Sequence, residues 1–323
     1  MKNQEKEVAE WAKKNEVIKT SIPIYLTLLL IKCFPKFFIN FMIRLISLIY
    51  FIFNKNAKVE CTRYQQNYIN YFGNEKLKKI NIYNHIKCFA ITFLEKVESW
   101  VKKVSTCKIT LQNDDVNQLI ARLNNGKGAF VICSHLGNSE ILRNLANNNQ
   151  IFVNKNIKVS VLMDLKSTKM FTNTVTKLNP RFTDNIIDIN DINPGTIEIL
   201  QDTIDSGGLV VIAGDRNSKD IHAKKVETKF LGKKAFLSYG VFLIAILLKS
   251  PIYYMFGLRE KDVSYNRKYN VFIKKSIYNI ENISRKDRET YINNICLEYI
   301  NELEKYCKEY PLQWYNFYDF WKE

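Results

Sequence analysis

Residues 134–140, SHLGNSE, combine two side chains that could move a proton, a histidine and a glutamate five positions apart. They follow the apolar run GAFVIC at 128–133, which is typical of a buried strand. A carboxylate beside an imidazole fixes the tautomer of the ring and raises its basicity, so His135 and Glu140 could act together as a general base on a hydroxyl. A substrate hydroxyl could then be the nucleophile, and no serine or cysteine of the protein is required.

The residues between this pair suit a tight turn from a strand into a helix. Gly137 permits backbone dihedrals that other residues avoid. Asn138 or Ser139 can cap a helix that begins after SHLG, and Glu140 then lies in the first turn, where the helix dipole favours a carboxylate. A plain capped turn without catalytic function has the same features, and the fragment by itself leaves both interpretations open.

Five short runs rich in β-branched or aromatic residues alternate with helical segments. They are GAFVICSH (128–135), IKVSVLMD (157–164), NIIDIN (185–190), GGLVVIAGDR (207–216) and SPIYYMFGLRE (250–260). Strands that alternate with helices predict an α/β fold with a mostly parallel sheet flanked by helices. Ligands of such folds bind at the carboxyl ends of the strands, where this chain has His135, Asp215, Arg216, Arg259 and Glu260.

The most apolar stretch of the chain is 22–53. It is interrupted by two lysines, a proline and an arginine, so it lacks the roughly 20 uninterrupted apolar residues of a clean membrane span. We expect an interfacial anchor or a re-entrant helix pair, with a single span or a buried helix of a soluble core as alternatives. The predicted division is an N-terminal helical membrane anchor region, 1–56, and an α/β domain, 57–323, which begins with amphipathic helices over 57–104.

The charge balance favours an acidic partner. The 323 residues include 48 Lys plus Arg against 32 Asp plus Glu, a formal net charge of +16. A nucleic acid, an anionic membrane surface or an acidic carrier protein would each fit this charge. The basic residues are dispersed and no nucleic-acid-binding module is recognisable, which argues against nucleic acid.

Several other chemistries lack their sequence signals. The seven cysteines form no CxxC pair and no ligand-like spacing with histidine, so they indicate buried thiols and neither a disulfide framework nor a zinc site. The sequence has no GxGxxG, P-loop, GxSxG or HExxH motif. Of the other two histidines, His85 is expected on a helix face as a structural residue, and His222 in a polar loop without supporting neighbours.

HLGNSE is similar to the H-x4-D/E motif of acyltransferases that act on glycerolipids and glycolipids. In detail it resembles the HLGNWE form of the late acyltransferases of lipid A biosynthesis, the lauroyl and myristoyl transferase family. Three further blocks resemble that family in its own order: GGLVVIAGDRN (207–217), TKFLGKKAFLSYGVFLIAILLKSPIYYMFGLRE (228–260) and YPLQWYNFYDFW (310–321). The early EWAKKNE and the apolar stretch behind it also match, so the resemblance covers nearly the whole chain.

The resemblance implies a glycerolipid acyltransferase-like fold and a role for each matching residue. His135 would deprotonate the acceptor hydroxyl and Glu140 would assist it. Asp215 and Arg216 correspond to strand-end residues of the family, and the arginine could steady phosphates of a lipid head group or of a carrier's pantetheine arm. A local ion pair between Asp215 and Arg216 is the alternative.

Further substrate contacts are expected from the later blocks. Gly232 and Lys233 of FLGKKAF would approach a phosphate or the carrier, although the lysine could equally lie in a solvated turn. Arg259 is expected to bind substrate as well. The aromatic residues after Pro311 are expected to dock onto the core, or else to line an acyl groove.

The implied protein is a membrane-associated acyltransferase at the cytoplasmic face of the bacterial inner membrane. It would move a fatty acyl chain from an acyl thioester of acyl carrier protein or CoA to a hydroxyl or amine of a lipid or glycolipid such as a lipid A precursor. The thioester is a co-substrate, and no metal, other cofactor or nucleic acid is expected. A non-catalytic lipid-binding protein of the membrane surface, built on the same scaffold, is the alternative.

Two places depart from the family pattern. Relatives usually carry an aromatic residue where this chain has Ser139. They also carry an F-P-x-G-P run where this chain has LSYGV at 237–241. The missing prolines change the expected shape of that loop, and this bears on the choice of chain length or acceptor.

Overall fold

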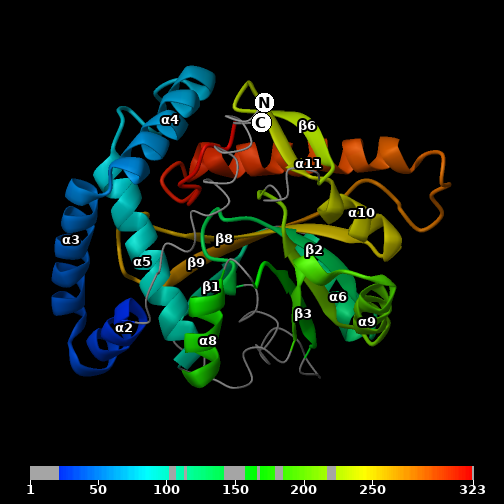
Figure 1. Cartoon of the computed structure of the whole chain (residues 1–323), viewed down its shortest axis with the longest axis horizontal. Coiled ribbons are helices and arrows are strands. Elements are labelled where there is room, and N and C mark those ends of the chain that lie inside the picture. The colour runs from blue at the N-terminus through cyan, green and yellow to red at the C-terminus, as the bar shows by residue number, and fades with distance from the viewer. Residues whose placement is uncertain are drawn as a thin grey trace, which may run out of the picture.

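The computed structural model describes residues 22–101, 107–112, 115–141, 157–165, 168–178, 185–216 and 223–321. They form a seven-stranded sheet with helices packed on it, beside a group of N-terminal helices (Figure 1). The strand order is β1-β9-β8-β2-β5-β3-β4, and all neighbouring strands are parallel except β8 and β9. The predicted α/β fold with a mostly parallel sheet is therefore confirmed.

All five strands predicted from the sequence are present, and further strands complete the sheet. The sheet strands are β1 (Lys108–Leu111), β2 (Ala129–Cys133), β3 (Val159–Met163), β4 (Ile186–Asp188), β5 (Leu209–Ala213), β8 (Ile252–Arg259) and β9 (Lys268–Lys275). The strands β6 (Lys225–Phe230) and β7 (Lys233–Ser238) form a separate antiparallel hairpin. The sequence did not predict β1, β9 or this hairpin, although the burial of alternate residues in β9 reflects a period of two.

Helices cover the sheet on both faces, as a parallel sheet requires. The α/β part contains α6 (Asp115–Asn124), α8 (Lys169–Leu178), α9 (Pro194–Asp205), α10 (Tyr239–Leu247) and α11 (Arg288–Glu309). Successive side chains of β2 enter different core clusters: Phe130 and Ile132 join α10 and α11, and Val131 joins α6. Figure 1 accordingly shows α11 and α6 on opposite sides of the sheet.

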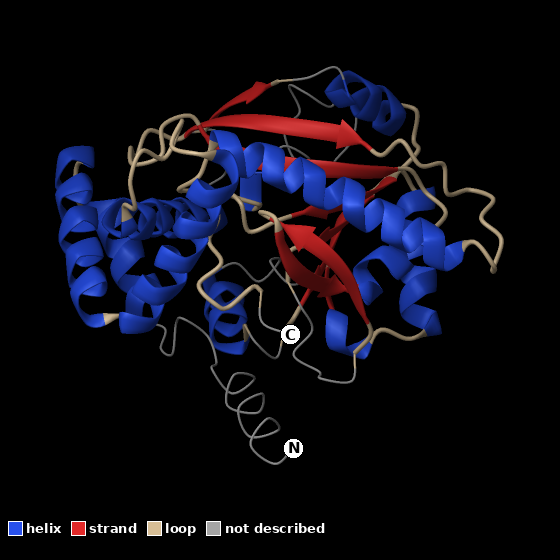
Figure 2. Cartoon of the chain, turned by 90° about the horizontal axis from the view of Figure 1, so that it is seen from above, coloured by secondary structure: helices blue, strands red, loops and turns tan. Residues whose placement is uncertain are grey.

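The N-terminal helices are α2 (Ile22–Cys33), α3 (Lys36–Phe53), α4 (Lys55–Phe72) and α5 (Ile82–Val101). They gather at one end of the molecule (Figure 2), and α3 packs on α4 and α5. The apolar stretch is thus a helix pair that breaks at Pro35, where the pyrrolidine ring interrupts helical hydrogen bonding. Because the helical packing continues through α5, a domain boundary at residue 56 stays a prediction.

Most of α3 is exposed, although it is the most apolar long helix described. Its buried residues are Ile39, Ile43 and Ser47, a single stripe at four-residue spacing, and only 17% of the helix is buried. The length and composition of α3 would allow it to cross a membrane. This exposure argues against a buried helix of a soluble core and hints at membrane association.

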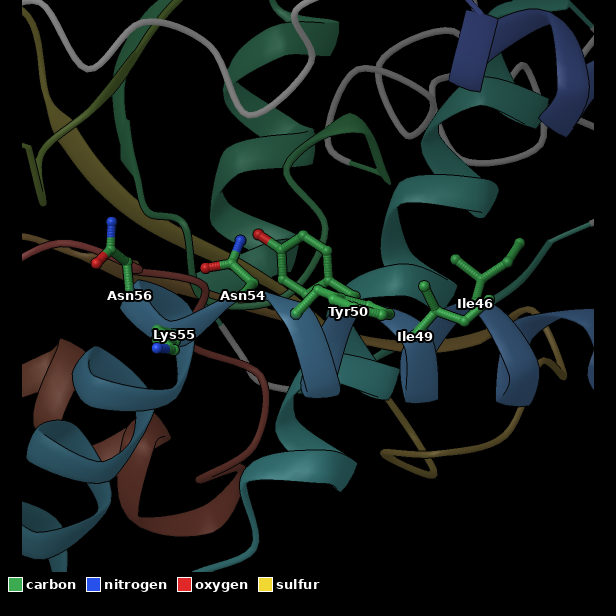
Figure 3. A pocket seen from close by; sticks show the side chains of 7 residues that line it. Ile46, Ile49, Tyr50, Asn54, Lys55 and Asn56 are labelled. Carbon is green, nitrogen blue, oxygen red and sulfur yellow. The ribbon is translucent and has the colours of Figure 1, made fainter.

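An open pocket of about 670 Å³ lies where α3 meets α4. Its lining residues are Ile46, Ile49, Tyr50, Phe53 and the polar residues 54–56, and Figure 3 shows the first three on one side of α3. None of these is a residue that the sequence predicted to do chemistry, so the pocket belongs to the exposed apolar face of α3.

The cysteines are all free thiols. Five are buried, Cys107 is half-buried and Cys33 is exposed. Within the described ranges, no group of three or more His, Cys, Asp or Glu side chains could hold a metal ion.

Candidate active site

His135 and Asp215 meet at the carboxyl edge of the sheet. The neighbouring parallel strands β2 and β5 pair in a register that sets Cys133 opposite Ala213, and each candidate residue lies two positions further on. The Gly214 N–H also donates to the Cys133 carbonyl at 2.9 Å, which extends the pairing beyond the strands. Two residues that are 80 positions apart in sequence are therefore brought side by side by the sheet itself.

Asp215 receives three hydrogen bonds on its two carboxylate oxygens. His135 donates through Nδ1 to Oδ1 at 2.8 Å and through its backbone N–H to Oδ2 at 2.8 Å. The Trp314 indole N–H donates to Oδ2 at 3.1 Å. Because a carboxylate accepts at Nδ1, the proton of the neutral ring lies there, and Nε2 carries the lone pair.

His135 and Asp215, which we call the dyad, both have shifted pKa values. Burial disfavours the charged carboxylate, yet the adjacent His135 and its hydrogen bonds, together with Arg216, hold the pKa of Asp215 below its ordinary value. Burial and the nearby Arg216 charge lower the pKa of His135, and the attraction of Asp215 opposes them only in part. His135 is therefore neutral at pH 7 and ready to accept a proton.

The turn that presents His135 is fixed by its backbone contacts. Gly137 has a φ of 76°, and a Cβ placed on it would lie 2.2 Å from the Gly257 carbonyl oxygen. The Asn138 N–H donates to that same oxygen at 2.8 Å. The Asn138 side chain accepts from the Glu140 N–H at 3.1 Å, so Asn138 provides the predicted cap, and helical structure begins at Glu140.

The sequence favoured Glu140 as the partner of the His135 ring, but Asp215 is the carboxylate that bonds to Nδ1. The Nδ1 atom of His135 is bonded to Asp215, and within the described part of the chain no hydrogen bond joins Glu140 to the ring. Glu140 is half-buried and its charge acts on the ammonium of Lys96. An assisting role for Glu140 stays a prediction.

Two cations face the dyad. The exposed Arg216 holds its guanidinium 5.5 Å from the Tyr318 ring, and the Asp215 carboxylate bonds to His135 and Trp314 instead of to Arg216. Lys96 of α5 was not predicted from the sequence. Burial lowers the pKa of Lys96, Glu140 opposes that effect, and Arg216 lowers it further, so this ammonium lies near the site.

Arg259 lies at the carboxyl end of β8, as predicted, but its side chain is fully buried. It donates to the Glu95 carboxylate at 2.8 Å and to the Asp262 carbonyl at 2.9 Å. The structure does not bring it together with the dyad. The predicted substrate-binding role finds no support in this placement, because the guanidinium donors are taken by groups inside the protein.

A buried polar network joins this arginine to the turn that carries His135. Tyr269 donates its hydroxyl to Glu95, and Asn138 donates to the Tyr269 hydroxyl at 3.2 Å. Glu95 is also the ion-pair partner of Arg259. Arg259 thus supports the position of the turn from behind.

Gly232 and Lys233 lie at the turn of the β6–β7 hairpin. Gly232 has a φ of 72°, and the preceding Leu231 donates its N–H to the Glu304 carboxylate at 2.5 Å. Lys233 is exposed and lines an open pocket of about 500 Å³ together with residues of α4, among them Lys58 and Arg63. A contact of Gly232 and Lys233 with substrate or carrier stays a prediction.

The other two histidines differ sharply from His135. His85 is buried, and its Nε2 lies 2.9 Å from the Trp314 carbonyl, with Nδ1 at 3.3 Å from the Gln65 amide nitrogen. Burial lowers its pKa to about 4, so it is a neutral structural residue, as predicted. His222 lies outside the described residues.

The mostly parallel sheet holds a neutral histidine against a buried aspartate at the carboxyl ends of two adjacent strands, an arrangement that suits an α/β enzyme in which the histidine accepts a proton. The family model of the bacterial lipid A biosynthesis acyltransferases matches residues 13–323, and the chain belongs to this family. It is by family an acyltransferase of lipid A biosynthesis, which implies an acyl donor and a lipid A precursor as acceptor. The comparison with curated proteins gave no match.

Proposed function

We propose that this protein transfers a fatty acyl chain from the thioester of an acyl carrier protein to a hydroxyl of a lipid A precursor, at the cytoplasmic face of the bacterial inner membrane. The observation that carries this assignment is the dyad, in which Asp215 holds Nδ1 of His135 at 2.8 Å. Among the described residues, Nε2 of His135 has no hydrogen-bond partner, and it therefore suits a substrate hydroxyl.

The transfer step follows from this protonation state. Nε2 of His135 accepts the hydroxyl proton while the hydroxyl oxygen attacks the thioester carbonyl carbon, and the carbonyl electron pair moves onto its oxygen. When the carbonyl forms again, the carbon–sulfur bond breaks and the departing sulfur takes the proton from His135. The charge of Asp215 stabilises the imidazolium between these two events.

We assign the nearby cations to the negative charges of the reaction. Arg216 is exposed and close enough to His135 to lower its pKa, so it can stabilise the oxyanion or hold a phosphate of the acceptor. Lys96 is placed to assist, since its charge also acts on His135. Neither residue is bonded to the Asp215 carboxylate.

The choice of carrier and membrane rests on surface properties. A formal charge of +16 suits an acidic acyl carrier protein and an anionic bilayer. The exposed apolar side chains of α3 include Phe41, Ile49 and Phe53, which could enter the interface between lipid head groups and acyl chains.

Vesicle flotation tests this membrane contact of α3. Ile49→Glu combined with Phe53→Glu should abolish flotation of the protein with anionic vesicles. A similar pair of changes on the buried stripe of α3 would instead unfold the protein.

The central experiment compares lipid extracts from cells that express the wild type, His135→Ala or His135→Gln at matched abundance. The glutamine keeps a donor for Asp215 but cannot accept a proton as imidazole does. Mass spectrometry should find a lipid that gains one acyl chain in the wild type alone. Equal lipid profiles in all three strains would refute the enzymatic assignment and favour the non-catalytic lipid-binding alternative.

A further inference from the structure

The segment that follows α11 lies against the turn that carries His135. Leu136 and Trp314 form an isolated antiparallel bridge. On one side of the bridge the Gly137 N–H donates to the Gln313 carbonyl at 2.8 Å, and on the other the Tyr315 N–H donates to the His135 carbonyl at 3.1 Å. The C-terminal segment therefore acts as a short additional strand beside the turn.

Gln313 fastens this segment to the end of β8. Its side chain is fully buried, its Oε1 accepts from the Arg259 N–H at 2.9 Å, and its Nε2 donates to the Arg259 carbonyl at 2.8 Å. The same amide donates to the Asp262 carboxylate at 2.8 Å. Since the turn is itself bonded to Gly257 of β8, the turn, the segment and the strand end are locked to one another.

Trp314 is held so that its N–H can point in only one direction. The side chain is 1% exposed, and its ring packs on Tyr64 at 4.9 Å, on Phe230 at 4.9 Å and on Phe320 at 5.0 Å. Its carbonyl oxygen lies 2.9 Å from Nε2 of His85. With both its ring and its backbone fixed, the indole N–H is aimed at Oδ2 of Asp215.

We propose that Trp314 is a positioning residue. Its indole N–H holds the Asp215 carboxylate in place and reduces the negative charge that this carboxylate presents to His135, so that His135 stays neutral. This role rests on the proposed function, because it presumes that His135 is the base. A carboxylate with one donor fewer attracts the Nδ1 proton more strongly, stabilises the imidazolium and leaves less neutral ring at neutral pH. In this role Trp314 acts on the ring of His135 through the Asp215 carboxylate.

The other charges that face His135 come from two elements. Asp215 and Arg216 follow β5, and Lys96 projects from α5. Glu140 acts on Lys96 from the start of its helix. A tryptophan substitution leaves all of these groups in the chain, so a change in the titration of His135 reports on the indole hydrogen bond.

Trp321 provides a matched control for the aromatic packing. Its indole N–H donates to the Phe230 carbonyl at 3.0 Å, and its ring lies 6.2 Å from that of Trp314. Trp321→Phe therefore removes an indole and a hydrogen bond from the same cluster without touching Asp215. A role in packing alone predicts similar behaviour for Trp314→Phe and Trp321→Phe.

The test is a titration of the full-length protein in detergent, labelled with ¹³C-histidine. The chain has three histidines, and His135→Ala assigns the signal of His135. Trp314→Phe should raise the pKa of His135 by about 0.5 to 1 unit, and Trp321→Phe should leave it unchanged. The acid limb of the pH profile of kcat should move by the same amount in Trp314→Phe, with KM nearly unaltered.

A second measurement uses the wild-type protein, so it does not depend on whether a tryptophan variant folds. In ¹⁵N-tryptophan-labelled wild type, one of the four indole N–H signals should shift with the midpoint of His135, and this coupling should vanish in His135→Ala. Three results would each overturn the positioning role. They are an unchanged pKa of His135 in Trp314→Phe, an equal change of this pKa in Trp314→Phe and Trp321→Phe, and four indole N–H signals that do not respond to the titration of His135. Acyl transfer that survives in His135→Ala would instead overturn the proposed function, whatever the titrations show.

Discussion

Asp215→Asn offers a sharp test of the dyad, because the structure fixes how the asparagine must lie. In the wild type Oδ2 accepts two N–H donors, from the backbone of His135 and the indole of Trp314, and Oδ1 accepts the third. An asparagine has only one oxygen. With that oxygen at the Oδ2 position, both donors are satisfied and the amide NH₂ faces Nδ1 of His135.

The opposite orientation would set the NH₂ group against two buried donors. Each buried donor without a partner costs about 1–3 kcal/mol, so this orientation is less stable by about 2–6 kcal/mol. The favoured orientation forces Nδ1 of His135 to accept, and the ring proton moves to Nε2. The variant should therefore fold normally but lack the lone pair that serves as the base, and its kcat should fall about 100- to 10,000-fold.

The assay is acyl transfer by the purified protein in detergent micelles, followed by mass spectrometry of the lipid product. Thermal unfolding of the same preparations serves as the control, and the melting temperature should change little. The double variant of Asp215→Asn with His135→Ala should be no slower than the slower single variant, since the two residues act as a unit. A variant that keeps a tenth or more of the wild-type kcat would show that Asp215 does not set the tautomer.

Four further outcomes follow from the structure. Gly137→Ala should cost about 3 kcal/mol or more in a urea unfolding experiment, since its added Cβ would meet a carbonyl of β8 at 2.2 Å; Gly73→Ala, with the same φ of 76° and no atom within 4 Å, should cost only about 1 kcal/mol. Burial lowers the pKa of His85 from 6.5 to about 4, so its contribution to stability is present above pH 6.5 and is lost as the pH falls. Between about pH 7.5 and about pH 5 the protonation of His85 should lower the free energy of unfolding by about 2 kcal/mol, and this loss should be absent in His85→Gln. Arg259→Met should lower the free energy of unfolding by about 3–5 kcal/mol because it leaves a buried carboxylate unpaired; unchanged unfolding with a raised KM would restore a substrate-binding role. Glu140→Gln should leave the acid limb of the pH profile in place, because His135 is held by another carboxylate, and a displaced limb would count against this.

The strands could be predicted because each is a short apolar run between turn residues, but their order could not. Between β2 and β5 in sequence lie β3 and β4, yet in the sheet β5 pairs directly with β2. The partner of His135 is therefore a residue 80 positions away, and sequence alone favoured the acidic residue nearest along the chain. The prediction that His135 and Asp215 both lie at strand ends was correct. Their contact could be predicted only from the order of the strands in the sheet.

Arg259 illustrates a second limit. Its position at the end of β8 was predicted correctly, but the direction of its side chain depends on the packing of α5, which supplies the carboxylate of Glu95. A signal was present in the sequence, because Glu95 and Glu98 lie among the apolar residues of that helix. The structure shows that both are buried. Buried carboxylates need basic partners, and two on one helix indicate that some arginines are structural.

The C-terminal aromatic residues illustrate a partial success. Docking onto the core was expected, and Trp314 and Phe320 are fully buried in it. What the pattern of aromatics could not reveal is that one indole reaches a carboxylate 99 residues away. Aromatic content predicts burial, whereas a hydrogen bond depends on the tertiary contact of the segment with the turn at His135.

The two carboxylates near His135 have environments that suit different work. Asp215 is fully buried and receives three donors, so its position is fixed before any substrate arrives. Glu140 is half-buried at the start of a helix, and its charge acts on the ammonium of Lys96, which the charge of Arg216 also affects. The Nδ1–H of His135 donates to Asp215, so Glu140 would influence the proposed reaction through its charge and not through a hydrogen bond to Nδ1. The H-x4-E spacing that drew attention to the site thus joins the proposed base to a carboxylate that acts on a neighbouring cation, while the carboxylate bonded to the ring follows the neighbouring strand.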